Sequence, residues 1–176
     1  MTPPIYAHGQ AVRLPTIDYR LRDLREADLA DTADIWFRSW HAAFPDLAHP
    51  MPYEAWLPRL RDDIATKCLC RVAILYAAVI GFSAVDVERS ILEQIFVAPE
   101  HQGAAVGRML LDDAKRLCPS GLRLMTLRRN ARATAFYERH GFEPGNVGIN
   151  PVNGLPSIEY VWRPRVGSFT GQIRRE

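Results

Sequence analysis

Hydrophobic and polar positions along this chain repeat in two different periods. Over 28–41 the hydrophobic residues recur every three or four positions, which predicts an amphipathic helix. The same spacing predicts a helix over 53–64 and a third over 106–117. A fourth helix is expected between Asn130, a residue type that caps helix N-termini, and Gly141, in the place of a left-handed C-cap glycine.

Shorter runs that are rich in β-branched and aromatic residues separate these helices and predict strands. We expect the strands at 19–22, 71–76, 79–87, 91–97, 122–127, 142–149 and 157–162. The resulting order is strand, two helices, three strands, helix, strand, helix and two strands. Helices interleaved with strands indicate an α/β or α+β layer fold, and the early hairpins favour a mixed sheet.

The composition is that of a globular domain. The chain has 176 residues, of which 48% are hydrophobic and 24% charged, enough for one substantial core. Residues 17–163 are expected to form the domain, with an N-terminal arm at 1–16 and a basic tail at 164–176. The net charge of +2 argues against nucleic acid as a partner, and no hydrophobic run is long enough to span a membrane. The cytoplasm is the expected location, because no export signal is visible and the three cysteines do not form a disulfide framework.

The segment 95–108 carries the most informative chemistry. A strand ends in it, a loop of small residues follows, and the helix over 106–117 begins. Small side chains let a ligand approach the main chain, and free N–H groups at a helix start attract anions. A pyrophosphate is the natural ligand, although an ordinary surface turn has a similar composition. Neither a P-loop motif nor a Rossmann glycine motif is present.

Two motifs of this chain resemble those of the GNAT N-acetyltransferase superfamily. One is Q-G-A-A-V-G at 102–107, which resembles the family pattern Q/R-x-x-G/A-x-G/A. The other is N-A-R-A-T-A-F-Y-E-R-H-G-F at 130–142, which resembles the family's N-x-x-A-x-x-F-Y-E-x-x-G-F. The likeness is strong over 79–145. It implies the GNAT fold, of the α/β (α+β) class: a mixed, mostly antiparallel seven-stranded sheet, splayed between its fourth and fifth strands at a bulge near Val97, with helices on both faces.

The resemblance implies that acetyl-CoA binds here as a co-substrate. Backbone N–H groups from Gly103 to Arg108 would hold its pyrophosphate, and the pantetheine arm would pair with the main chain of Ile95 to Val97. The Val97 N–H would then stabilise the oxyanion. The implied coenzyme-binding residues are Ile95, Phe96, Val97, Gln102, Gly103, Ala104, Ala105, Val106, Gly107, Arg108, Asn130 and Tyr137. Glycine is commoner in the family at Ala105, where alanine with a positive φ would cost about 1–2 kcal/mol.

Tyr137 and Glu93 are the candidate catalytic residues. The family often uses the tyrosine that matches Tyr137 as general acid for the leaving thiolate, and packing against Phe142 is the alternative. Glu93 is the candidate general base, because alternation along a strand places it on the same side as Val97; an ordinary strand residue is the alternative. Asn130 either contacts the pantetheine or caps its helix, and both can hold at once.

The resemblance implies direct transfer of an acetyl group from acetyl-CoA to an amine through a tetrahedral intermediate, with no metal. The acceptor is expected to be a small-molecule or peptide amine, with no nucleic acid and no membrane as partner; homodimers are common in the family. The acids within 23–34 could suit a cationic amine, or they could serve a helix start. The five histidines lack paired metal spacing, and Cys68 and Cys70 are too close for a zinc knuckle. The alternatives are a non-catalytic acyl-CoA-binding sensor and an interaction protein that uses the basic tail.

Overall fold

The computed structural model describes residues 6–7, 10–11, 19–103 and 105–164. Seven strands form one sheet in the order β3-β4-β5-β6-β7-β9-β8, and β1 pairs with β2 in a separate two-stranded sheet. The strands are β1 (Tyr6–Ala7), β2 (Gln10–Ala11), β3 (Tyr19–Asp23), β4 (Leu69–Leu75), β5 (Ala78–Asp86), β6 (Ile91–Val97), β7 (Leu122–Leu127), β8 (Phe142–Ile149) and β9 (Pro156–Trp162).

Helices connect and cover the strands of the large sheet. The helical elements are η1 (Glu26–Asp28), α1 (Leu29–Ala43), η2 (Tyr53–Ala55), α2 (Trp56–Arg59), η3 (Leu60–Ile64), α3 (Ala65–Lys67), η4 (Pro99–His101), α4 (Val106–Leu117) and α5 (Ala131–Arg139). The helix predicted over 53–64 is a series of short turns from η2 to α3, with a π turn at η3.

The hydrophobic periodicity located most of these elements closely. The strand and helix boundaries at 91–97, 106–117, 122–127 and 142–149 agree with β6, α4, β7 and β8. The other expected elements differ from the structure by one to three residues at an end. The expected N-terminal arm and C-terminal tail lie almost entirely outside the described residues.

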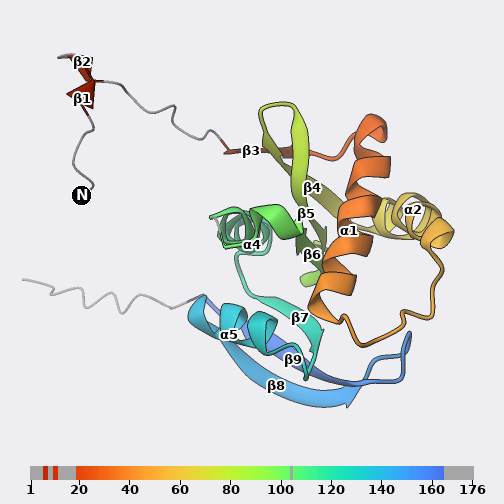
Figure 1. Cartoon of the computed structure of the whole chain (residues 1–176). Helices are drawn as coiled ribbons and strands as arrows, with labels where there is room; N and C mark the ends of the chain where they lie inside the picture. The colour runs from red at the N-terminus through yellow and green to blue at the C-terminus, as the bar shows by residue number, and fades with distance from the viewer. Residues whose placement is uncertain (1–5, 8–9, 12–18, 104, 165–176) are drawn as a thin grey trace, which may run out of the picture.

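The large sheet is split between its fourth and fifth strands. Neighbouring strands pair antiparallel everywhere except at β6 and β7, which run parallel. These two strands are paired only at Ile91 and Arg123, so they are not joined along the rest of β6 (Figure 1). The expected splay between the fourth and fifth strands is therefore confirmed.

The bulge expected near Val97 is at Glu93 instead. Ala84 of β5 pairs with Gln94, whereas the next residue, Val85, pairs with Leu92, so Glu93 is the extra residue on β6. The inference that Glu93 lies on the same side as Val97 therefore loses its basis. A bulge interrupts the period-two alternation on which that inference depended.

Helices α1 and α2 cover one face of the sheet, and α4 and α5 cover the other (Figure 1). The side chains of β5 divide between these two layers. Phe82 and Ala84 join the cluster that includes Trp36 and Trp56, whereas Val85 packs in a cluster with Leu111. A fully buried side chain of this kind contributes about 1.5–3 kcal/mol, so both layers hold the split sheet in place.

Candidate active site

The main-chain groups of Val97 face the split in the sheet. Ala98 donates its N–H to the Ile80 carbonyl at 2.9 Å, so these two residues form a hydrogen-bonded pair. Hydrogen-bonded and non-hydrogen-bonded pairs alternate along antiparallel strands, so Val97, opposite Gly81, directs its N–H and C=O away from β5. The same alternation turns the main-chain groups of Ile95 toward the gap between β6 and β7.

The Val97 carbonyl is held by two side chains. It accepts hydrogen bonds from Ser39 Oγ of α1 and from Gln102 Nε2, each at 2.9 Å. Gln102 Oε1 in turn accepts a hydrogen bond from Arg132 in the first turn of α5. Gln102 therefore ties the loop before α4 to both β6 and α5. No sequence motif predicts the hydrogen bond from Ser39, because α1 is far from β6 in the sequence.

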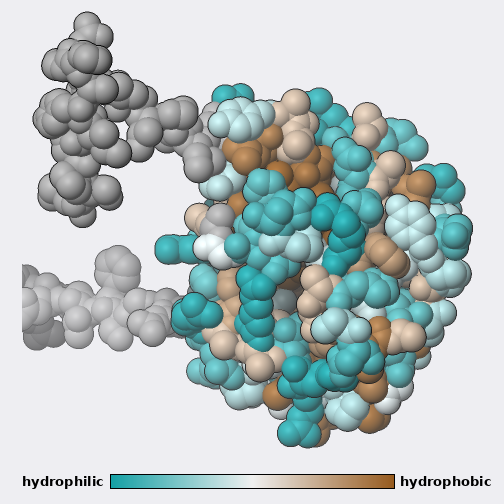
Figure 2. Space-filling view, in the orientation of Figure 1, coloured by the Kyte–Doolittle hydropathy of each residue, from teal (hydrophilic) through white to brown (hydrophobic). Residues whose placement is uncertain are grey.

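Main-chain amides without an acceptor inside the helix lie where α4 begins. Its N-cap residue, Ala105, makes no side-chain capping bond, and Met109 donates to the Ala105 carbonyl at 2.9 Å. The N–H groups of Val106 and Gly107 precede that bond and have no acceptor inside the helix. Together with the helix dipole, such N–H groups favour an anion at this position. Figure 2 shows a largely hydrophilic surface over this end of the molecule, hollowed between α4 and α5.

The loop before α4 needs glycine at Gly103 and not at Ala105. Gly103 has a φ of 89°, a left-handed value that disfavours other residues. Ala105 has right-handed angles, φ −67° and ψ −2°, so alanine carries no penalty there. A Cβ on Gly107 would lie 3.6 Å from the Phe136 ring, an ordinary contact. Ala104 lies outside the described residues.

The expected caps of α5 are confirmed. Asn130 accepts a hydrogen bond from the Ala133 N–H at 3.1 Å, and Gly141 follows the helix with a φ of 80°. Arg129, next to this cap, forms an ion pair of 2.6 Å with Asp46. The cap fixes the helix start, and a contact between Asn130 and pantetheine stays a prediction.

Tyr137 lies in the hydrophobic cluster beneath α5. Only 7% of the residue is exposed, and its ring centroid lies 5.7 Å from that of Phe142 and 5.8 Å from that of Tyr160. Burial raises the pKa of the Tyr137 phenol, so the hydroxyl stays protonated throughout the neutral range. Among the described residues no hydrogen-bond acceptor holds this hydroxyl, which leaves it able to donate to a ligand.

Glu93 projects from the bulge as an exposed residue. Its negative charge is felt at Cys68, whose thiol pKa is raised to about 11, first by burial and then by Glu93. The carboxylate therefore lies near the strand that follows α3. The structure brings Val97, Gln102 and the start of α4 together, whereas it sets Glu93 at the other end of β6.

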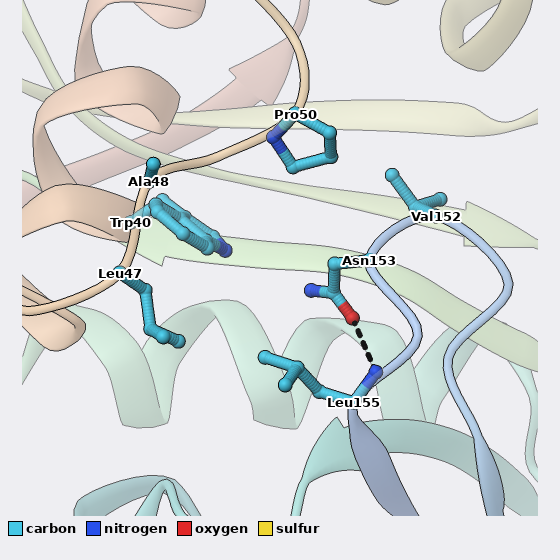
Figure 3. A pocket seen from close by; sticks show the side chains of 7 residues that line it. All are labelled: Trp40, Leu47, Ala48, Pro50, Val152, Asn153 and Leu155. Carbon is cyan, nitrogen blue, oxygen red and sulfur yellow. Dashed lines mark hydrogen bonds between the residues drawn. The ribbon is translucent and has the colours of Figure 1, made fainter.

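A cavity of about 270 Å³ lies between the C-terminal half of α1, the loop after it and the hairpin between β8 and β9 (Figure 3). Its lining residues are Trp40, Leu47, Ala48, Pro50, Val152, Asn153 and Leu155. Sequence reasoning missed this cavity, because its two walls are far apart in the sequence and no periodicity connects them.

The described part of the chain contains no group of three or more His, Cys, Asp or Glu that could hold a metal ion. Cys68, Cys70 and Cys118 are free thiols. Within the same residues, no helix combines the length and the hydrophobicity needed to cross a bilayer.

Comparisons with known proteins agree with this geometry. Residues 67–144 match the family described as the acetyltransferase (GNAT) domain. The chain is 30% identical over 131 residues to the peptidyl-lysine N-acetyltransferase YjaB of Salmonella typhimurium, an alignment that covers 74% of this chain and 81% of the relative.

Two solved structures share the fold. One is a GCN5-related N-acetyltransferase from Rhodopseudomonas palustris, with a TM-score of 0.69 and 21% identity over 86% of this chain and 100% of the other. The second is the PaiA N-acetyltransferase of Thermoplasma acidophilum in complex with coenzyme A, with a TM-score of 0.67 and 17% identity over 84% of this chain and 100% of the other.

Proposed function

Because this chain belongs to the GNAT superfamily of acetyl-CoA-dependent N-acetyltransferases, we propose that it moves an acetyl group directly from acetyl-CoA to an amine. The observation that carries the proposal is the split beside β6. There, main-chain groups of Ile95 and Val97 face an open gap, and α4 begins nearby with amides that have no acceptor inside the helix.

We propose that two sets of main-chain groups hold the coenzyme. The amides at the start of α4, at Val106 and Gly107, would bind the pyrophosphate, because free N–H groups and the helix dipole both favour an anion. The pantetheine arm would lie along β6 and pair with the exposed groups of Ile95, as an added strand pairs with a sheet edge. Gln102 supports this arrangement by holding the loop against Val97.

The chemistry that we propose needs no covalent enzyme intermediate. The amine nitrogen forms a bond to the thioester carbon, and the oxygen becomes an oxyanion that the Val97 N–H stabilises. The carbonyl then re-forms as the carbon–sulfur bond breaks, and Tyr137 donates its hydroxyl proton or a hydrogen bond to the sulfur. The nitrogen loses its extra proton as the amide forms, and that proton restores the phenol. The ammonium proton must leave before attack. Glu93 stays our candidate for accepting this proton, because its carboxylate is exposed. Waters would relay the proton over the distance between the amine and Glu93.

The alternative to an enzyme is a sensor that binds acyl-CoA without turnover. Tyr137 favours the enzyme, because its unpaired, protonated hydroxyl can serve the leaving sulfur. The Salmonella relative is named for acetylation of peptidyl lysine, so a lysine peptide belongs beside small amines among the acceptors to test.

The proposal is tested by two measurements on the purified protein. Calorimetry should detect binding of acetyl-CoA, and thiol release should rise above the amine-free rate for at least one amine in the panel. Binding without turnover on any amine would favour the sensor. Absence of binding would contradict both functions.

A further inference from the structure

The cavity lined by Trp40 adjoins the split on the face opposite α4. Trp40 follows Ser39, whose hydroxyl donates to the Val97 carbonyl at 2.9 Å. The hydrophobic cluster that contains Trp40 also includes Phe96 of β6 and Leu127 of β7, one residue from each side of the split. A molecule in the cavity would therefore lie close to the point where the Val97 N–H meets the gap.

The cavity is lined by uncharged residues. Most of its lining side chains are hydrophobic, and none of the seven carries a charge. The polar side-chain groups are the Trp40 indole N–H and the Asn153 amide, whose oxygen accepts from the Leu155 N–H at 3.2 Å. Figure 3 shows the Asn153 amide nitrogen pointing toward Trp40 across the cavity. These side chains present hydrogen-bond donors and no carboxylate.

Three acids that could attract a cationic acceptor are already paired with arginines. Asp46, beside the cavity wall, forms its 2.6 Å ion pair with Arg129, which lowers the pKa of Asp46. Farther away, Asp34 pairs with Arg38 at 2.7 Å. Asp28, at the start of α1, likewise pairs with an arginine of β3. Within 23–34, the ion pairs of Asp28 and Asp34 favour a structural role for these two acids over a role in binding a cationic amine.

We propose that this cavity receives an acceptor that carries one uncharged, hydrophobic group of about side-chain size beside its amine, and that it disfavours acceptors with several positive charges. At about 270 Å³ the cavity is smaller than the roughly 300–1,000 Å³ of sites for drug-sized ligands. An unpaired ammonium would lose its hydration in it without gaining a counter-charge. The inference rests on the proposed acetyl transfer and names the substrate class of the same site.

The test compares three acceptors at saturating acetyl-CoA. Leucinamide has a hydrophobic side chain beside its amine, glycinamide lacks one, and spermidine carries several positive charges. We expect kcat/KM for leucinamide to exceed that for glycinamide roughly 10-fold or more, because the cavity would be left unfilled by the smaller molecule. Spermidine should be the poorest of the three. An equal or higher kcat/KM for glycinamide or spermidine would overturn the inference and leave acetyl transfer standing.

A matched pair of variants tests whether the cavity itself sets this preference. Val152 lines the cavity and is 40% exposed, whereas Val147 lies on β8 outside the lining and is 66% exposed. Val152→Asp should lower kcat/KM for leucinamide roughly 10-fold and raise that for spermidine, with the Kd for acetyl-CoA unchanged. Val147→Asp should match the wild type in all three values. Equal behaviour of the two variants would overturn the assignment of the cavity, and absence of turnover with every amine would overturn the proposed function as well.

Discussion

Val97 directs both of its main-chain groups toward the gap in the sheet. Ser39 and Gln102 hold its carbonyl, each at 2.9 Å, so the peptide group cannot easily rotate. The Val97 N–H belongs to the preceding peptide group, whose Phe96 carbonyl faces Phe82 of β5 in a hydrogen-bonded pair, so the direction of this N–H is also fixed before any substrate arrives. A fixed donor stabilises developing negative charge better than a mobile one, because no reorganisation is needed when the charge appears.

Replacing Tyr137 by Phe should lower kcat by about 10²-fold with little change in the Kd for acetyl-CoA, because the hydroxyl would act only on the leaving sulfur. Stopped-flow measurement of thiol release and calorimetry would separate the two quantities. Tyr160→Phe is the matched control. Tyr160 lies in the same cluster and donates to Glu138 at 2.7 Å, so its loss should reduce stability and spare kcat. An unchanged kcat in Tyr137→Phe would remove Tyr137 from the mechanism.

The loop before α4 acts at the scale of an element, because it sets where the helix amides point. Gly103 gives the loop its left-handed turn, and nothing lies within 4 Å of a Cβ built there, so the constraint is backbone conformation and not space. Gly107 differs from it, since a Cβ at that position makes only ordinary contacts.

We therefore expect Gly103→Val to weaken acetyl-CoA binding by roughly 10-fold or more. A β-branched residue at this φ is strained by about 1–2 kcal/mol, and this strain would displace the loop. Gly107→Ala should change the Kd less. Isothermal calorimetry on both variants would check the difference. Wild-type affinity in Gly103→Val would contradict the assigned pyrophosphate loop.

Helix α4 is also tied to the sheet by a buried carboxylate. The Asp113 side chain is 3% exposed and bonds Arg71 of β4 at 3.2 Å and Arg116 one turn along the helix. Its neighbour Asp112 is 51% exposed and forms a surface pair with Arg108 at 3.4 Å. Adjacent positions of one helix therefore differ sharply in burial.

Asp113→Ala should lower the free energy of unfolding by about 1.5–3 kcal/mol, because it removes the hydrogen bonds that the buried carboxylate accepts from Arg71 and Arg116, while Arg71 keeps its ion pair with Asp23. Asp112→Ala, the control on the same helix, should change it by less than about 0.5–1 kcal/mol. Urea denaturation would measure both values. Similar losses in the two variants would show that burial of Asp113 contributes little.

At the scale of the whole molecule, stability should depend on pH through His49. Its ring lies 4.6 Å from those of Trp40 and Trp56, and its Nδ1 accepts from the Met51 N–H at 3.0 Å. Burial lowers the pKa of His49. The unfolded chain therefore binds a proton below about pH 6.5 that the folded chain rejects. The free energy of unfolding should fall as the pH drops below that value, and the loss should level off once the pH is below the lowered pKa of the folded chain.

Urea denaturation at pH 7.5 and 5.5 would measure this loss. The pH-dependent difference should shrink in His49→Asn, since asparagine can still accept a hydrogen bond but does not titrate. His101→Asn, in η4 and outside the aromatic cluster, should retain the wild-type difference. An equal difference in His49→Asn and the wild type would refute the assignment.

The sequence by itself determined the elements and the family. Asn130 and Gly141 marked the ends of α5, and the periodicity over 106–117 marked α4, because caps and helix periods act over a few neighbouring residues. The loop that we propose to bind the coenzyme was visible for the same reason: Gly103 and the helix start that follows it are local features.

Only the tertiary structure decided how distant segments meet. The bulge at Glu93 depends on the pairing of β6 with β5, so alternation within β6 alone could not show the side of that carboxylate. The direction of the Val97 N–H likewise follows from the register of two strands. The cavity joins Trp40 to the hairpin at Asn153, and Asp34 of α1 pairs with Arg38. Long-range packing and charge pairing determine these features, and neither produces a periodic pattern in the sequence.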